Sequence, residues 1–225
     1  MEAIETSRRT RWQAGVLSLV AGYTDTVGFL TFHAFAGLIT GNTVLLGIAL
    51  SESRHRRALV SAVVIASFLV GMMAAKLLRA LGATLVMLLG LEAGLIIAAA
   101  LLPPKFLFAG PALSLAMGLQ NASAEHFAGV RLNTVVMTGD MQKMVNGFIA
   151  RLRGVGGRSG EGADVTILCV YGGYLGGALT GGAVHVFVGR ALLFAPLLLP
   201  LALLRFPMPL ARLLRRRGDG QGPHT

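Results

Sequence analysis

The chain has 225 residues, of which 54% are hydrophobic and 13% are charged, and its mean hydropathy is +0.70. A soluble domain of this size cannot bury so much apolar surface, so the composition excludes an ordinary water-soluble protein. The formal net charge of +10 would suggest nucleic acid in a soluble protein, but here the basic residues fall in loops and tails, as in cytoplasmic membrane anchors. We expect the lipid bilayer as a partner and no nucleic acid.

The apolar segments predict an all-α, polytopic transmembrane helix bundle, because a lone strand cannot satisfy its backbone in lipid. Six segments approach the roughly 20 residues that span a bilayer. Two are short, and glycines at 37, 41 and 47 interrupt the first of these. In chain order the segments are 14–32, 35–50, 58–78, 83–102, 106–124, 132–150, 165–187 and 190–206.

Two membrane topologies fit these segments. If all eight cross, most Lys and Arg residues, including the cluster Arg54-His55-Arg56-Arg57, lie on the side of both termini. The positive-inside tendency therefore favours eight crossings, cytoplasmic termini, and two four-span halves related by an axis along the membrane normal. The alternative has six full spans plus two short re-entrant segments, which gives three-span halves of inverted topology.

The two halves of the chain repeat each other around polar residues. Residues 17–25 (LSLVAGYTD) are echoed 96 positions on by residues 113–121 (LSLAMGLQN), and Thr40-Gly41-Asn42 is echoed by Thr138-Gly139-Asp140. A membrane chain built this way usually forms its working site where the two copies meet. The predicted divisions are a basic N-terminus (1–12), a first membrane repeat (13–102), a second membrane repeat (106–206) and a basic tail (207–225).

Ionisable residues within apolar segments are the first candidates for chemistry. A carboxylate such as Asp25 at membrane depth costs about 2.5–3.5 kcal/mol on insertion scales, so it needs a partner, a cation or a proton. Asp25 is either a proton- or cation-responsive group or the cap of a helix break. Asp140 and Lys143 share a helix face, as a plain or a switchable ion pair. Glu92 is either a proton carrier or the partner of Lys76 or Arg79.

The polar motifs also offer uncharged ligands. A glycine between Thr40 and Asn42 lets the helix unwind, so that side-chain oxygens lie beside freed backbone groups and bind a solute or an ion. The alternative is a close helix crossing held by side-chain hydrogen bonds. The complete substrate- or ion-binding hypothesis comprises Asp25, Thr40, Asn42, Gln120, Asn121, Thr138, Asp140 and Lys143.

Small residues recur every four positions near the end of the chain. Gly173, Gly177 and Gly181 predict a helix-packing surface, and residues 68–75 are its first-half counterpart. Such a ladder is compatible with a homo-oligomer. No metal-binding His/Cys cluster, nucleophile elbow, phosphate loop or dinucleotide fingerprint occurs, so we expect no metal, no cofactor and no enzyme activity.

Three motifs resemble a known family. Residues 21–29 (AGYTDTVGF), 38–43 (LITGNT) and 116–122 (AMGLQNA) are similar to the YoaK-like family of bacterial inner-membrane proteins, and the resemblance covers residues 11–205. It implies a multispanning protein of the bacterial inner membrane, often predicted with about six helices. It implies no substrate and no reaction.

The leading hypothesis is a small secondary transporter or permease for a small solute. Asp25 and Asp140 would be its ionisable groups for proton coupling, and the Thr and Asn residues of the motifs would be its polar ligands. A non-transporting membrane scaffold or sensor is the second hypothesis, because the same motifs would then only lock helices together. An intramembrane enzyme acting on a lipophilic substrate is the third.

Overall fold

A computed structural model describes residues 2–103, 108–123, 126–127, 130–131, 142, 145–146, 149, 153 and 159–203. It confirms the all-α prediction, since the regular elements of the described residues are helices apart from one pair of two-residue strands. In chain order the elements are α1 (Glu2–Phe32), α2 (Ile39–Ser51), α3 (His55–Ala80), α4 (Leu85–Leu101), α5 (Ala109–Ser123), β1 (His126–Phe127), β2 (Val130–Arg131), α7 (Ser159–Phe187), η1 (Ala191–Phe194), α8 (Ala195–Leu198) and η2 (Leu199–Leu203).

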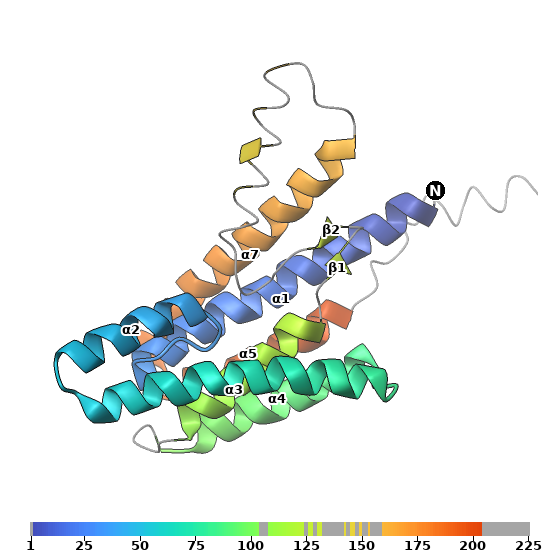
Figure 1. The fold of residues 1–225 in the computed structure, drawn as a ribbon. Coiled ribbons are helices and arrows are strands. Elements are labelled where there is room, and N and C mark those ends of the chain that lie inside the picture. The colour runs from blue at the N-terminus through green and yellow to red at the C-terminus, as the bar shows by residue number, and fades with distance from the viewer. Residues whose placement is uncertain are drawn as a thin grey trace, which may run out of the picture.

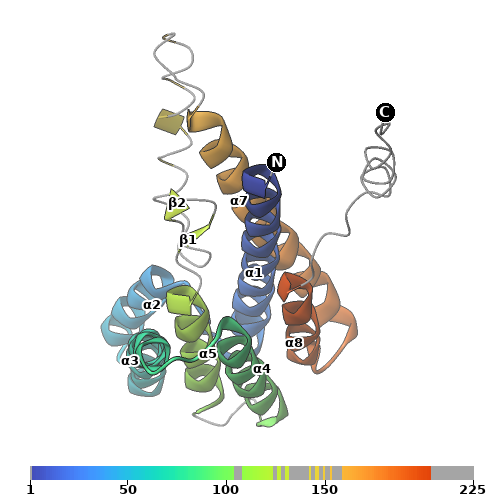
Figure 2. The ribbon, with the colours of Figure 1, turned by 90° about the vertical axis from the view of Figure 1, so that its right-hand side faces the viewer.

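Two helix pairs dominate the bundle. The most extensive contacts join α1 to α7 and α3 to α5, and α4 covers another side of α5 (Figure 1). Figure 2 shows α1 between α5 and α8. The core between these elements is apolar, with Leu17, Ile96, Leu113, Met117 and Leu199 almost wholly buried.

Three described helices are long and apolar enough to cross a membrane: Thr10–Phe32, His55–Ala80 and Val165–Phe187. Of the other predicted full spans, two are shorter in the structure and one falls largely outside the described residues. Helix α4 has 17 residues and α5 has 15, so both are shorter than the segments predicted from hydropathy. The predicted span at 132–150 falls largely outside the described residues.

Contacts between helices give their directions. Leu19 and Tyr23 of α1 lie against Gly177 and Gly181 of α7 in the same order, so α1 and α7 are parallel. Helices α3 and α5 are also parallel, because Ser114 Oγ donates to Val64 O (2.9 Å) and Arg79 Nη2 donates to Ser123 O (3.2 Å).

The two pairs run in opposite directions. Gln120 Nε2, late in α5, donates to Leu17 O (2.9 Å), early in the membrane part of α1. At the other end of the same helices, Gly110 lies beside Phe32. Helix α5 is therefore antiparallel to α1, and α3, which follows α5, is antiparallel to α1 as well.

The antiparallel directions of α1 and α3 correct the eight-crossing topology. Residues 33–54 begin and end at the same end of the bundle, so α2 makes no net crossing and is re-entrant. Gly37 lies beside Asp25, seven residues and about 10 Å of helix back from the end of α1. The segment thus returns into the bundle before α2 begins.

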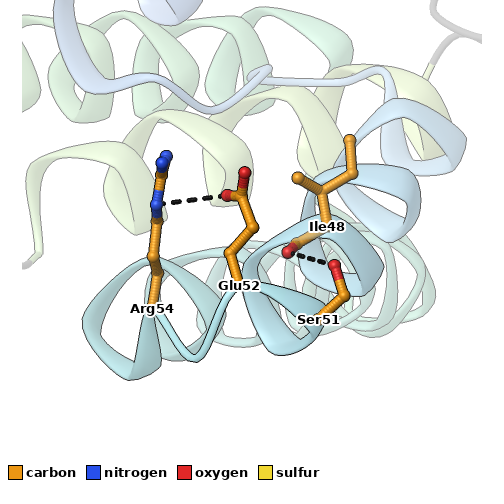
Figure 3. Close-up of polar contacts among 4 residues, drawn as sticks. All are labelled: Ile48, Ser51, Glu52 and Arg54. Atoms are coloured by element: carbon orange, nitrogen blue, oxygen red, sulfur yellow. Dashed lines mark hydrogen bonds and ion pairs between the residues drawn. The ribbon is translucent and has the colours of Figure 1, made fainter.

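A tight exposed turn reverses the chain between α2 and α3. Ser51 Oγ donates to Ile48 O (2.8 Å), and Arg54 Nε lies 3.1 Å from Glu52 Oε2 (Figure 3). Both charged side chains are about half exposed, and an ion pair of that kind contributes little to stability. The turn is set mainly by backbone geometry, with Ser53 in the left-handed region at φ 55°.

The re-entrant topology has a direct test. In a Cys169→Ser background, Ser53→Cys and Gly189→Cys should react with a membrane-impermeant maleimide from the same side of sealed vesicles, because both turns lie at the end of the bundle where α1 and α7 finish. Eight crossings would put positions 53 and 189 on opposite sides. Labelling of the two cysteines from opposite sides would therefore overturn the re-entrant assignment of α2.

Candidate functional site

The buried carboxylate of Asp25 holds the start of α2. Its Oδ1 accepts hydrogen bonds from the backbone N–H of Gly37 (2.6 Å) and of Leu38 (3.3 Å), the two residues before α2. Leu38, the N-cap residue, makes no side-chain cap of its own. A carboxylate at this position also complements the positive end of the helix dipole. Of the two interpretations of Asp25, the cap of a helix break is the one that these contacts fit.

The second oxygen of Asp25 is bound by α7. Tyr174 Oη donates to Asp25 Oδ2 at 2.7 Å. Tyr174 was not among the residues predicted for the site. The available signal was its hydroxyl-bearing side chain within a run of glycines, but its partner is 149 positions away in the chain. Asp25 therefore joins α1, the start of α2 and α7 at one point.

Asn42 closes the same loop from the other side. Its Oδ1 accepts from Phe35 N (2.9 Å), and its Nδ2 donates to Phe35 O (2.8 Å). Because irregular backbone at membrane depth needs internal partners, this two-way clip explains a buried Asn just inside α2. Thr40 does not join it, since its side chain is exposed. We call Asp25, Asn42, Tyr174 and the loop residues 33–38 the loop clip.

Gln120 and Asn121, the two candidates on α5, form hydrogen bonds to residues outside the loop clip. Gln120 is buried and links α5 to α1 through Leu17 O. Asn121, which matches Asp25 in the predicted repeat, donates from Nδ2 to Met72 Sδ (3.8 Å), while its Oδ1 is buried and accepts no hydrogen bond from a described residue. Asn121 therefore keeps an unused acceptor where Asp25 has three donors.

The remaining predicted site residues are Thr138, Asp140 and Lys143, and all three lie outside the described residues. The hypotheses about the Asp140–Lys143 pair and the second polar motif stay predictions.

One stripe of glycines on α7 faces α1. A Cβ added at Gly173 or Gly177 would collide with the carbonyl oxygen of Gly15 or Leu19, and one added at Gly181 would lie 2.9 Å from Tyr23 O. By contrast, a Cβ added at Gly172 or Gly176 would have no atom of another described element within 4 Å. One of the two glycine stripes on α7 is thus a close helix contact, and the other is open.

Matching glycine contacts occur in the second helix pair. A Cβ added at Gly22 would collide with the carbonyl oxygen of Tyr174. One added at Gly118, 96 positions after Gly22, would collide with the carbonyl oxygen of Phe68. From the partner helices, a Cβ added at Gly177 would collide with Leu19 O, and one added at Gly71 would collide with Leu115 O. The same displacements, 96 positions from α1 to α5 and 106 from α3 to α7, therefore relate both pairs of contacts.

A second buried carboxyl lies away from the loop clip. Glu92 of α4 is 0% exposed, and neither of its oxygens accepts a hydrogen bond from a described residue. The alternative in which Glu92 pairs with Lys76 or Arg79 is therefore not observed, and Arg79 Nη2 donates to Ser123 O. No cluster of three or more His, Cys, Asp or Glu side chains suited to a metal ion occurs in the part of the chain that the structure describes.

Long apolar helices and a short helix capped inside the bundle define a multispanning helical membrane protein. Residues 13–205 match the model of the family described as "Protein of unknown function (DUF1275)", and the chain belongs to that family. This confirms the resemblance found in the sequence.

A relative within the curated proteins is the UPF0700 transmembrane protein YoaK of Bacillus subtilis (strain 168), 27% identical over 151 residues. The aligned region is 61% of this chain and 66% of YoaK, so the chain spans just under two thirds of that relative. No solved structure matches the chain. These similarities support a transmembrane protein and supply no activity.

Proposed function

We propose that this chain is a small secondary transporter or permease for a small solute, built from two inverted halves and located in the bacterial inner membrane with cytoplasmic termini. The observation that carries the proposal is the pair of matched glycine contacts on helices of opposite direction. Inverted repeats with a discontinuous helix near the repeat interface are the architecture of many secondary transporters, in which one half rocks against the other.

The loop clip supplies the polar part of such a site. It brings a carboxylate, an amide and a phenol hydroxyl from three segments to the buried start of a re-entrant helix. The clip also favours the second candidate, a non-transporting scaffold. Asp25 and Asn42 bind the protein's own backbone, and a locked clip would only hold helices together.

Ligand binding and flux separate these functions. We expect at least one compound in a chemically broad solute panel to raise the melting temperature of the purified chain, because a ligand of the folded state stabilises it by about 2.7 kcal/mol at a hundredfold excess over its Kd. The same compound should cross the membrane of proteoliposomes in response to its gradient. Asp25→Asn should slow this flux, whereas Thr43→Ala, on the exposed side of α2, should not.

Other outcomes identify the rivals. Absence of any stabilising solute and of flux, together with low melting temperatures for Asp25→Asn, would overturn the transporter and favour the scaffold. Chemical conversion of a lipophilic compound without net movement across the vesicle membrane would favour an intramembrane enzyme.

A further inference from the structure

Of the two carboxyls that are buried in the described part of the chain, Glu92 is the one with no hydrogen-bond partner there. Asp25 accepts three hydrogen bonds, whereas both oxygens of Glu92 are buried without one from any described residue. Glu92 is also the only ionisable residue in the sequence of α4. A function confined to the loop clip leaves this side chain unexplained.

Among the described elements, those packed around Glu92 offer no countercharge. Helix α4 packs against α5, η1, α8 and η2, and these four segments contain no Asp, Glu, His, Lys, Arg, Cys or Tyr. On α4 itself the buried side is made by Leu88, Leu89, Ile96 and Ala99. Beyond the turn before α4, Arg79 is bound to Ser123 O and Lys76 is exposed.

An ionised carboxylate is far more costly in such surroundings than a neutral acid, because no described residue donates a hydrogen bond to replace its hydration. We propose that Glu92 is a proton-binding site: its carboxyl carries a proton in this packed arrangement and releases it when α4 separates from α5 and from residues 191–203. In that step the O–H bond breaks, the proton passes to water, and the electron pair stays on the carboxylate.

The packing of α4 allows such a separation. The helix is held by one side only, since Val86, Met87, Leu91 and Ile97 are exposed on the rest of its surface. A Cβ added at Gly90 or Gly94 would likewise have no atom of another described element within 4 Å. Moving α4 outward therefore breaks contacts on a single face. In the proposed transporter, the proton is then the coupling ion, and Glu92 carries it instead of Asp25. Only this coupling role depends on the proposed function.

The first test uses the unmodified chain. Dicyclohexylcarbodiimide reacts with protonated carboxyls in apolar surroundings: the acid adds across one C=N bond, its proton goes to nitrogen, and acyl transfer leaves a stable acylurea with no atom lost. At neutral pH we expect peptide mass spectrometry to locate the adduct at Glu92. Exposed Glu52 should be modified only by a water-soluble carbodiimide, and Asp25, held by three donors, by neither reagent.

The second test detects the protonated carboxyl of Glu92 by infrared spectroscopy. The infrared spectrum of the folded protein at neutral pH should contain the carbonyl band of a protonated carboxylic acid, and Glu92→Gln should lack it. Glutamine imitates the neutral acid in size, so we expect this variant to fold. The melting temperature of the wild type should fall as the pH is raised, since unfolding lets Glu92 ionise, and that of Glu92→Gln should stay level. Glu52→Gln is the matched control and should behave as the wild type.

If wild type and Glu92→Gln have the same carbonyl band, the proton site is overturned. It is also overturned if the wild type lacks this band and its Glu92 is not labelled by the carbodiimide. Neither test requires transport, so the two proposals fail separately. Labelling at Glu92 without flux of any solute leaves the proton site and removes the transporter. Solute flux that is unaffected by pH, with Glu92 ionised, leaves a transporter that uses no proton at this residue.

Discussion

Gly177→Ala is expected to destabilise the protein by about 2–3 kcal/mol, while Gly176→Ala, one position away, leaves its stability unchanged or slightly raised. The new methyl at position 177 would overlap the backbone of α1 at Leu19 and lie 2.9 Å from Tyr23 N, so two helices must move apart. At position 176 the methyl enters open space. Unfolding of the detergent-solubilised variants, followed by circular dichroism, measures the difference.

The second helix pair provides a further comparison. Gly71→Ala should behave like Gly177→Ala, because a Cβ at Gly71 would collide with Leu115 O. Gly90→Ala in α4, where nothing lies within 4 Å, serves as its control. Equal stabilities for Gly177→Ala and Gly176→Ala would show that α1 and α7 do not approach closely through this stripe.

Tyr174→Phe is expected to cost about 1.5–3 kcal/mol of stability, which is typical of a hydrogen bond to a charged group. Asp25→Ala should cost more, because it removes the buried acceptor of Gly37, Leu38 and Tyr174 at once, and each donor left unsatisfied costs about 1–3 kcal/mol. In the Asp25→Ala background, Tyr174→Phe should have almost no further effect. A double-mutant cycle on unfolding free energies measures this coupling.

Tyr171→Phe is the matched control on the same helix, because the Tyr171 side chain is partly exposed at 39%. It should leave stability unchanged in both backgrounds. Additive effects of Asp25→Ala and Tyr174→Phe would contradict the loop clip and return Asp25 to the status of a free membrane carboxylate.

The two alternatives for Asp25 show how far residue types alone could lead. An Asp inside an apolar helix required compensation, and that requirement was visible in the sequence. The compensating groups are two backbone N–H groups of a returning loop and the hydroxyl of Tyr174. No local pattern predicts them, because they meet Asp25 only when α7 packs against α1.

The membrane topology shows a different limit. Loop charges favoured eight crossings because the basic cluster at 54–57 would join the N-terminus. In the re-entrant arrangement that cluster moves to the other end, but Lys76 and Arg79, late in α3, move to the end where α1 begins. The positive-inside tendency counts charges in loops, so it discriminates poorly between topologies that exchange one basic group for another.

By itself, the sequence determined that this is a helical membrane protein of its family, that the 173–177–181 stripe is suited to close packing, and that residues 25, 42 and 92 are polar positions in apolar surroundings. The family followed from the resemblance of three motifs, whereas composition and periodicity suffice for the rest, because lipid forces each segment to satisfy its own backbone. Only the tertiary structure decided that α2 re-enters the bundle, that Asp25 and Asn42 hold its loop, and that Glu92 accepts no hydrogen bond from any residue the structure describes. Those outcomes depend on the direction in which helices pack and on contacts between distant residues, which hydropathy does not encode.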